Sequence, residues 1–287
     1  MRRAIALFVE DKPLLLANSH WLYESWSHIQ SDDTDLVFMG PKAALEKLPE
    51  DVVKIVQQPV TDDPGWLDYR FINSIACLTD PSASVLNNYD IVVRTDLDIF
   101  LTPAWNRFYP SECITGVGRY SNDDRVRENI QRIAQKFGLT HRGVTNIGST
   151  IYGPSGLIRE ICRLITEITW YIRTVEFKND YGEWPSWYYG VSTLYATEIA
   201  VNHLVPSLDV PTNMLDAYSH SVESVDKYPH IHCWHTDNIF SKFQCFDGNY
   251  DHMSDDNLNL GVINEYCLSM ALRARRRVLG TSGRWSV

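Results

Sequence analysis

Two aspartates separated by one residue, Asp96 and Asp98, have the type and spacing that most clearly predict chemistry in this sequence. They follow an apolar run at residues 91–93, which predicts a buried strand that ends at the two carboxylates. Alternate residues of an extended chain point the same way, so both side chains can face one site. A hard divalent cation shared with a phosphate would relieve their repulsion. An acidic turn that closes a strand is the competing interpretation.

The segments around the aspartates alternate between strand-like and helix-like patterns. Apolar runs predict strands at residues 4–9, 35–39, 52–56, 90–94, 114–118, 146–152 and 230–235. Other patterns predict helices at residues 18–29, 41–48, 68–78, 123–137, 154–175 and 192–203, with loops at 179–189 and 247–259. This order predicts an α/β protein with a parallel sheet between helices. Ligands of such sheets bind at the carboxyl ends of the strands, where Asp96 and Asp98 lie.

The composition excludes some classes of protein. The chain has 287 residues, of which 44% are hydrophobic and 22% are charged, as in ordinary soluble globular proteins. A net charge of −10 argues against a surface built mainly to bind nucleic acid. Five arginines without any acidic residue nevertheless fall between Arg273 and Arg284. This tail is expected to be either a solvated helix end or a phosphate-binding arm.

Cysteine usage and the lack of long apolar runs indicate a cellular location. The six cysteines include no C-x-x-C pair, which suits reduced thiols better than a disulfide framework. No apolar stretch is long enough to span a bilayer, so we expect no transmembrane segment and a cytoplasmic protein. No repeat or linker divides the chain, so we expect a single domain over residues 1–287.

Four motifs together give the sequence a resemblance to a known family. They are residues 90–98, the segment Asn146-Ile-Gly-Ser149, the helix that contains Glu198, and His232-Cys-Trp-His235. In this order the chain resembles a glycosyltransferase of the GT-A fold. The resemblance implies an α/β, GT-A-like (Rossmann-like), mostly parallel twisted sheet flanked by helices. It also implies a nucleotide-binding half at residues 1–110, a sugar and acceptor half at residues 111–270 and a basic tail at residues 271–287.

The resemblance implies a metal ion, Mn²⁺ or Mg²⁺, chelated by the diphosphate of a nucleotide-sugar, with a UDP-sugar as the expected donor. Asp98 is the expected direct ligand, and Asp96 reaches the metal through water or holds the ribose. A late histidine often completes the metal shell in that fold. His232 and His235 are three residues apart and would face opposite sides of a strand, so only one of them is expected to bind the metal. We favour His235, because Lys242 follows it at loop distance and could meet the phosphates. A histidine in an ordinary loop is the other interpretation.

Further site residues are assigned by the same resemblance. Arg70 is expected either to contact the sugar or diphosphate or to lie on the surface. The residues expected to line the sugar pocket, or to form a plain core strand, are Asn146, Gly148 and Ser149. Glu198 is the expected base toward the acceptor, unless it is only a surface position. Its rival is Glu183, in the loop at residues 179–189, which is rich in aromatic residues and is called the aromatic loop below. An inverting enzyme needs such a base, whereas a retaining enzyme can use the leaving phosphate.

The sequence therefore predicts a metal-dependent glycosyltransferase. One alternative is a nucleotidyltransferase or another metal-phosphate enzyme, although residues 9–13 lack the glycine-rich loop that such enzymes commonly carry after the first strand. The other is a non-catalytic carbohydrate- or nucleic-acid-binding module of the same fold. The acceptor stays open among a glycan, a lipid-linked sugar, a protein hydroxyl and a modified nucleic-acid base, and so does the stereochemistry of transfer.

Overall fold

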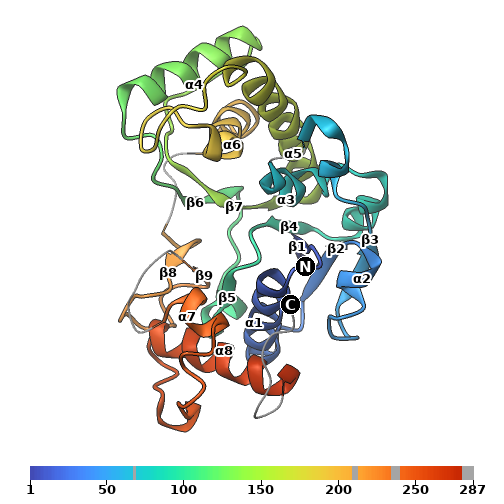
Figure 1. Ribbon diagram of the computed structural model, residues 1–287, viewed down its shortest axis with the longest axis vertical. Coiled ribbons are helices and arrows are strands. Elements are labelled where there is room, and N and C mark those ends of the chain that lie inside the picture. Colours follow the sequence, from blue (N-terminus) through green and yellow to red (C-terminus); the bar gives the residue numbers. More distant parts are fainter. Residues whose placement is uncertain (67–68, 209–212, 234–239, 280–287) are drawn as a thin grey trace. The chain divides into compact units, whose positions relative to one another are not determined.

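Six strands form a mixed β-sheet flanked by helices in the computed structural model of the chain, which describes residues 1–66, 69–208, 213–233 and 240–279 (Figure 1). The strands are β1 (Arg3–Phe8), β2 (Thr34–Gly40), β3 (Val53–Val56), β4 (Ile91–Arg94), β6 (Ile114–Val117) and β7 (Ile147–Pro154). Their order in the sheet is β3-β2-β1-β4-β7-β6. The fold is therefore α/β, as the alternation of sequence patterns predicts.

The directions of the strands confirm only part of the expected mostly parallel sheet. Strands β1 and β4 pair in parallel, as do β2 and β3. Strand β7, however, runs antiparallel to both of its neighbours, β4 and β6. An apolar run shows that a segment is extended and buried but carries no information about which way it runs beside its partner. The sheet is therefore mixed: the sequence patterns predict its parallel pairs, and they do not predict the antiparallel direction of β7.

Two compact units make up the chain, and each combines segments that are distant in sequence. Unit 1 contains Met1–Leu7, Gln57–Thr95 and Pro110–Thr212. Unit 2 contains Phe8–Val56, Asp96–Tyr109 and Asn213–Val287. The units are thus interleaved along the chain, and the functional halves expected at residues 1–110 and 111–270 stay a prediction.

In the part of unit 1 that the structure describes, four α-helices contribute apolar side chains to the core. They are α3 (Asn73–Ala76), α4 (Asp124–Lys136), α5 (Ser155–Tyr171) and α6 (Ser192–Leu204). Helix α5 buries Ile158, Ile161, Ile165 and Ile168 at helical spacing and packs against α6. Helix α4 begins where the side chain of Asp123 accepts a hydrogen bond from the backbone N–H of Arg125. Helices α4, α5 and α6 match segments that the sequence predicts to be helical.

The helix predicted at residues 68–78 is not continuous, and residues 67–68 lie outside the described part. A 3₁₀ turn at Arg70–Ile72 precedes the single α-turn of α3. The amide of Asn73 exchanges two hydrogen bonds with Thr61, at 3.1 and 3.4 Å. A short polar side chain that bonds outside its own helix favours a break over a regular helix.

Unit 2 contains a second sheet that the sequence patterns do not predict. Its strands are β5 (Ile99–Leu101), β9 (His230–His232) and β8 (Ala217–Tyr218), in that order. The α-helices that the structure describes in this unit are α1 (Pro13–Ile29), α2 (Lys42–Leu45), α7 (Lys242–Phe246) and α8 (Ile263–Leu279). Helices α1 and α8 pack together, and a buried cluster that includes Trp21, Phe100, Ile231 and Tyr266 joins them to the small sheet. One face of the small sheet is therefore buried in the core of unit 2.

The predicted basic tail is, where the structure describes it, the end of helix α8. Ala271, Leu272 and Ala274 are buried in the core of unit 2. Its arginines face acidic partners: Arg273 and Arg276 pair with Asp255, Arg275 with Asp251, and Arg277 with Glu24. The four arginines of this segment are therefore engaged within unit 2, and residues 280–287 lie outside the described part.

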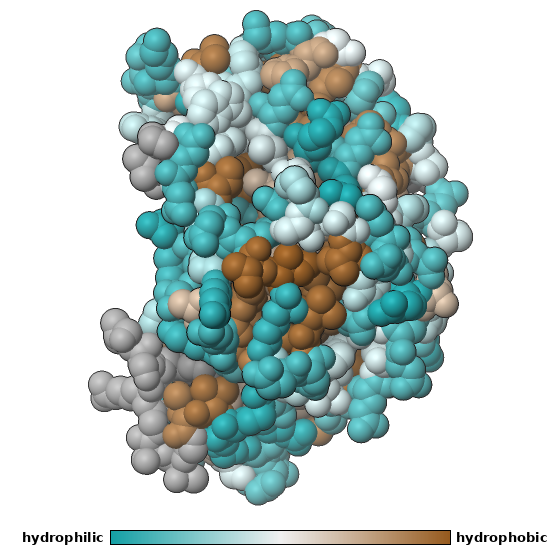
Figure 2. Space-filling view, turned by 90° about the vertical axis from the view of Figure 1, so that its right-hand side faces the viewer, coloured by the Kyte–Doolittle hydropathy of each residue, from teal (hydrophilic) through white to brown (hydrophobic). Residues whose placement is uncertain are grey.

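The hydropathy of the surface and of the helices is the last feature of the fold. The face drawn in Figure 2 is mostly hydrophilic, with apolar side chains gathered in its middle. Among the residues that the structure describes, no helix is both long and apolar enough to cross a membrane.

Candidate metal site

Asp96, Asp98 and His232 meet in unit 2. The two aspartates lie on the segment between β4 and β5, and His232 is the last residue of β9. Strands β5 and β9 pair antiparallel with Ile99 opposite His232, and the N–H of Cys233 donates to the carbonyl of Asp98 at 2.8 Å. This backbone pairing brings the histidine to the aspartates although more than a hundred residues separate them in sequence.

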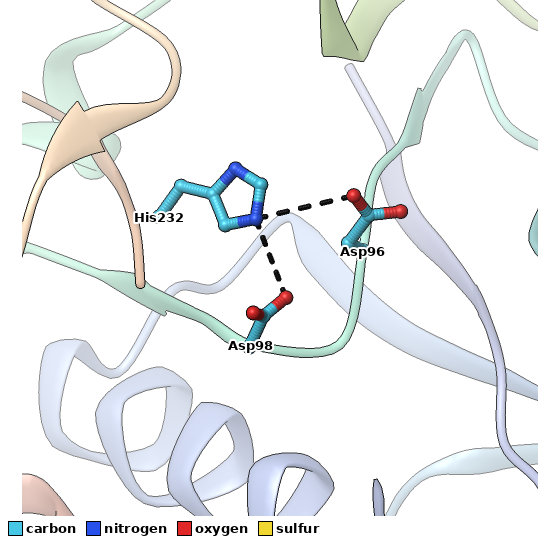
Figure 3. Close-up of side chains that lie close together, drawn as sticks. All are labelled: Asp96, Asp98 and His232. Carbon is cyan, nitrogen blue, oxygen red and sulfur yellow. Dashed lines mark ion pairs between the residues drawn. The ribbon is translucent and has the colours of Figure 1, made fainter. Parts of the chain in front are cut away.

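The three side chains point toward one another (Figure 3). His232 Nε2 lies 3.3 Å from Asp98 Oδ1 and 3.9 Å from Asp96 Oδ2. One ligand atom from each residue lies within 4.8 Å of the others. The exposed fractions of the side chains are 34% for Asp96, 19% for His232 and 14% for Asp98, so the cluster is partly buried and still open to solvent. Two carboxylates and an imidazole form a donor set that suits Mn²⁺ or Mg²⁺.

Lys242 brings a positive charge to the cluster of Asp96, Asp98 and His232. Its Nζ lies 2.5 Å from Asp98 Oδ2, at the first residue of α7. Burial alone would raise the pKa of Asp98, but His232 and Lys242 outweigh it and hold this pKa below its usual range. Burial would likewise lower the pKa of His232, but Asp98 and Asp216 raise it well above its ordinary value. Without a metal, the carboxylates are thus neutralised by an imidazolium and an ammonium.

Two further groups stand on the other side of His232. The buried Asp216 places its Oδ1 3.4 Å from His232 Nδ1 and 3.6 Å from His230 Nδ1. The backbone N–H of Asp216 donates to His230 Nδ1 at 3.1 Å. His230 is fully buried, and burial lowers its pKa to about 4, so this histidine is neutral near neutral pH.

His232, rather than His235, is the described histidine beside the aspartates. His235 and its neighbours at 234–239 lie outside the described residues, so its assignment stays a prediction. The sequence carried a signal for His232 that the proximity of Lys242 obscured. Ile231 and Cys233 are apolar and buried, so strand alternation turns His232 to the opposite face. Asp216 had no comparable signal, because its position depends on the pairing of β8 with β9.

The other predicted site residues belong to unit 1. Arg70 is exposed on its 3₁₀ turn, and Glu183 is exposed in the aromatic loop. Gly148 and Ser149 lie in β7, where the carbonyl of Ser149 accepts a hydrogen bond from Arg94. Of the predicted residues, the structure therefore unites Asp96, Asp98 and Lys242 in unit 2, and Asn146 with Glu198 in unit 1.

Glu198 forms the centre of a clamp on the loop before β7. Its Oε2 accepts the backbone N–H of Asn146 at 2.8 Å, and its Oε1 lies 3.3 Å from His141 Nε2. His141 Nδ1 accepts the N–H of Gly143, so the proton of the neutral ring is on Nε2 and points to Glu198. Asn202, one turn later on α6, accepts the N–H of Arg142 at 3.0 Å. Both oxygens of Glu198 are thus engaged in holding this loop.

The chain belongs to the family described as domain of unknown function (DUF7164), whose model matches residues 1–279. The matched range contains all three candidate metal ligands and Lys242. A comparison with curated proteins finds no match.

Proposed function

We propose that this chain is a metal-dependent glycosyltransferase that moves a sugar from a nucleotide-sugar, with a UDP-sugar as the expected donor, to a hydroxyl acceptor. The observation that carries the proposal is the convergence of Asp96, Asp98 and His232, with Lys242 bound to Asp98. On the basis of the sequence resemblance, the proposal also includes a GT-A-like fold for the mixed sheet.

The chemistry of the donor set supports a divalent cation shared with a diphosphate. A metal held there would neutralise the charge that develops on a departing nucleoside diphosphate. Asp98 and His232 are oriented by the pairing of β5 with β9, so they need little rearrangement to bind it. Lys242 can turn from Asp98 to a phosphate oxygen, because a cation on Asp98 would repel its ammonium group.

An inverting mechanism would need a base, for which the sequence predicts Glu198 or Glu183. Both oxygens of Glu198 are occupied, one by a backbone N–H and one by His141. Glu183 is exposed and stays a prediction for this role. A retaining mechanism would need neither, because the leaving phosphate can accept the proton of the acceptor.

We extend the proposal to a cytoplasmic location. All six cysteines are free and buried, and burial raises the pKa of Cys77, Cys113 and Cys162 above the ordinary value. Such thiols are structural and suit a reducing compartment.

Hydrolysis of a panel of nucleotide-sugars tests the proposed function. We expect release of a nucleoside diphosphate with Mn²⁺, and none in EDTA or in the Asp98→Asn variant. Asp226→Asn is a matched control in the same unit, because Asp226 is exposed and pairs with Arg107 at 2.9 Å. Release of pyrophosphate from nucleoside triphosphates would favour a nucleotidyltransferase instead. Tight metal-dependent binding without turnover of any donor would favour a non-catalytic binding module.

A further inference from the structure

A buried carboxylate lies directly behind the candidate metal-ligating histidine. The side chain of Asp216 is 2% exposed, and its Oδ1 is 3.4 Å from His232 Nδ1, the ring nitrogen that faces away from Asp98. Strands β8 and β9 pair with Tyr218 opposite His232 and Ala217 opposite Ile231, which fixes Asp216 just before the paired residues. This register places a carboxylate at one nitrogen of His232 and two carboxylates at the other.

Of the two histidine rings beside Asp216, the ring of His232 is the one that can donate an Nδ1–H to its carboxylate. His230 Nδ1 also lies near the carboxylate, at 3.6 Å, but this nitrogen accepts the backbone N–H of Asp216. A nitrogen whose lone pair accepts a hydrogen bond does not carry a proton to donate. Within this contact set, the Asp216 carboxylate therefore receives its ring proton from His232 Nδ1.

We propose that Asp216 is a positioning residue: it accepts the Nδ1–H of His232 and so directs the Nε2 lone pair at the metal held by Asp96 and Asp98. The inference rests on the proposed metal site and deepens it. A histidine that binds a metal through one nitrogen commonly donates the other N–H to a carboxylate, which fixes both the tautomer and the ring orientation. Loss of such a partner costs roughly 10–100-fold in metal affinity.

The backbone of Asp216 fits this role and makes a clean substitution available. Its φ is 60°, in the left-handed region that Asp and Asn adopt more readily than most residues. An Asp216→Asn variant therefore retains the size and the backbone preference of the native residue, and removes only the charge that favours the Nδ1–H tautomer.

Titration of the full chain with Mn²⁺ alone, followed by calorimetry, tests the inference. We expect Asp216→Asn to bind Mn²⁺ roughly 10–100-fold more weakly than the wild type, and Asp226→Asn to bind it unchanged. In a His232→Ala background, Asp216→Asn should cause no further loss, because Asp216 acts through the histidine. Equal affinities of wild type and Asp216→Asn, or the same loss in both backgrounds, would overturn the inference.

A second measurement needs no variant at position 216. In ¹⁵N-histidine NMR of the Mg²⁺-saturated wild type, His232 should carry its proton on Nδ1 and none on Nε2, and the opposite tautomer would contradict the inference. Failure of the wild type to bind any divalent cation would instead contradict the proposed function, so the two failures are distinguishable.

Discussion

Each unit of the molecule contains a histidine 3.3 Å from a carboxylate, and the two pairs differ in what surrounds them. In unit 1, His141 faces Glu198, and in unit 2, His232 faces Asp98. The side chains of His141 and Glu198 are only 5% and 1% exposed. The Glu198 oxygen that does not face His141 accepts the backbone N–H of Asn146. The cluster at Asp98 is partly open to solvent and is balanced by the side chains of His232 and Lys242.

The difference between the two pairs separates a carboxylate that holds the fold, Glu198, from one that can exchange its partners, Asp98. A backbone N–H is fixed by the fold, so Glu198 cannot release it without moving the loop before β7. An ammonium on a flexible side chain can leave, and a divalent cation can take its place. The distance from the histidine to the carboxylate is the same in both pairs. The identity and mobility of the partners therefore decide whether a carboxylate can bind a metal ion.

The largest expected effect comes from the Asp98→Asn substitution. It removes a charged ligand that contacts both His232 and Lys242. Because loss of a partner that only orients a ligand already costs about 10–100-fold, we expect loss of Asp98 itself to weaken Mn²⁺-dependent binding of a nucleoside diphosphate by more than about 100-fold. Calorimetric titration measures this, with Asp226→Asn as the control. Near-native affinity of Asp98→Asn would remove the distinction between the two units.

The Glu198→Gln substitution should affect stability and not the metal. The amide oxygen can still accept the N–H of Asn146, but the amide N–H₂ would face the Nε2–H of His141. A buried donor without an acceptor costs about 1–3 kcal/mol, so we expect a loss of that size in the free energy of unfolding. Urea unfolding measures it, with the exposed Glu160→Gln on α5 as control. Lost turnover with unchanged stability would show that Glu198 is the base after all.

Lys242→Gln should have opposite effects on two ligands. Removing the ammonium frees Asp98 Oδ2, so Mn²⁺ alone should bind more tightly, by roughly 10–100-fold if one charge-assisted hydrogen bond of about 1.5–3 kcal/mol is relieved. The complex of Mn²⁺ with a nucleoside diphosphate should bind more weakly, because its phosphate loses a cation. Paired titrations with and without the nucleotide decide. Weakening of both would mean that Lys242 only holds the site together.

A smaller effect is expected on the pH dependence of stability of the metal-free protein. The pKa of His232 lies well above 6.5 in the folded chain, because Asp98 and Asp216 outweigh the effect of burial. The folded state then binds this proton more tightly than the unfolded state does. The resulting stability is complete below pH 6.5 and is lost as the pH rises through the raised pKa.

Urea unfolding in EDTA across this range tests the pH prediction. The loss of stability toward alkaline pH should be smaller in His232→Gln than in the wild type. Identical pH profiles of the two proteins would show that the imidazolium of His232 does not stabilise the cluster.

Local sequence patterns predict the elements of this fold better than their arrangement. The strands at β1, β2, β4 and β7 are apolar enough to be read directly, and α4, α5 and α6 have clear helical spacing. The direction of β7 and the small sheet of β5, β9 and β8 are set by long-range pairing. Strand β9 lies within the strand predicted at residues 230–235, whereas β5, with three residues, and β8, with two, contain too few residues for their pattern to be distinctive.

The candidate site shows the same limit. Asp96 and Asp98 are separated by one residue, so their spacing alone predicts a shared site. The contact of His232 with them depends on the register of β9 against β5, and the contact of Asp216 depends on β8. Asn146 and Glu198 were predicted to serve the sugar and the acceptor, yet they bond to each other through a backbone N–H, which only the folded chain reveals.

Anomalous diffraction from a crystal soaked with Mn²⁺ and UDP tests the central claim most directly. The account predicts a manganese peak bounded by Asp96, Asp98 and His232, with the diphosphate on the open side of the ion and Lys242 turned from Asp98 to a phosphate oxygen. A fully occupied nucleotide without metal at these residues, or manganese bound only elsewhere, would contradict it.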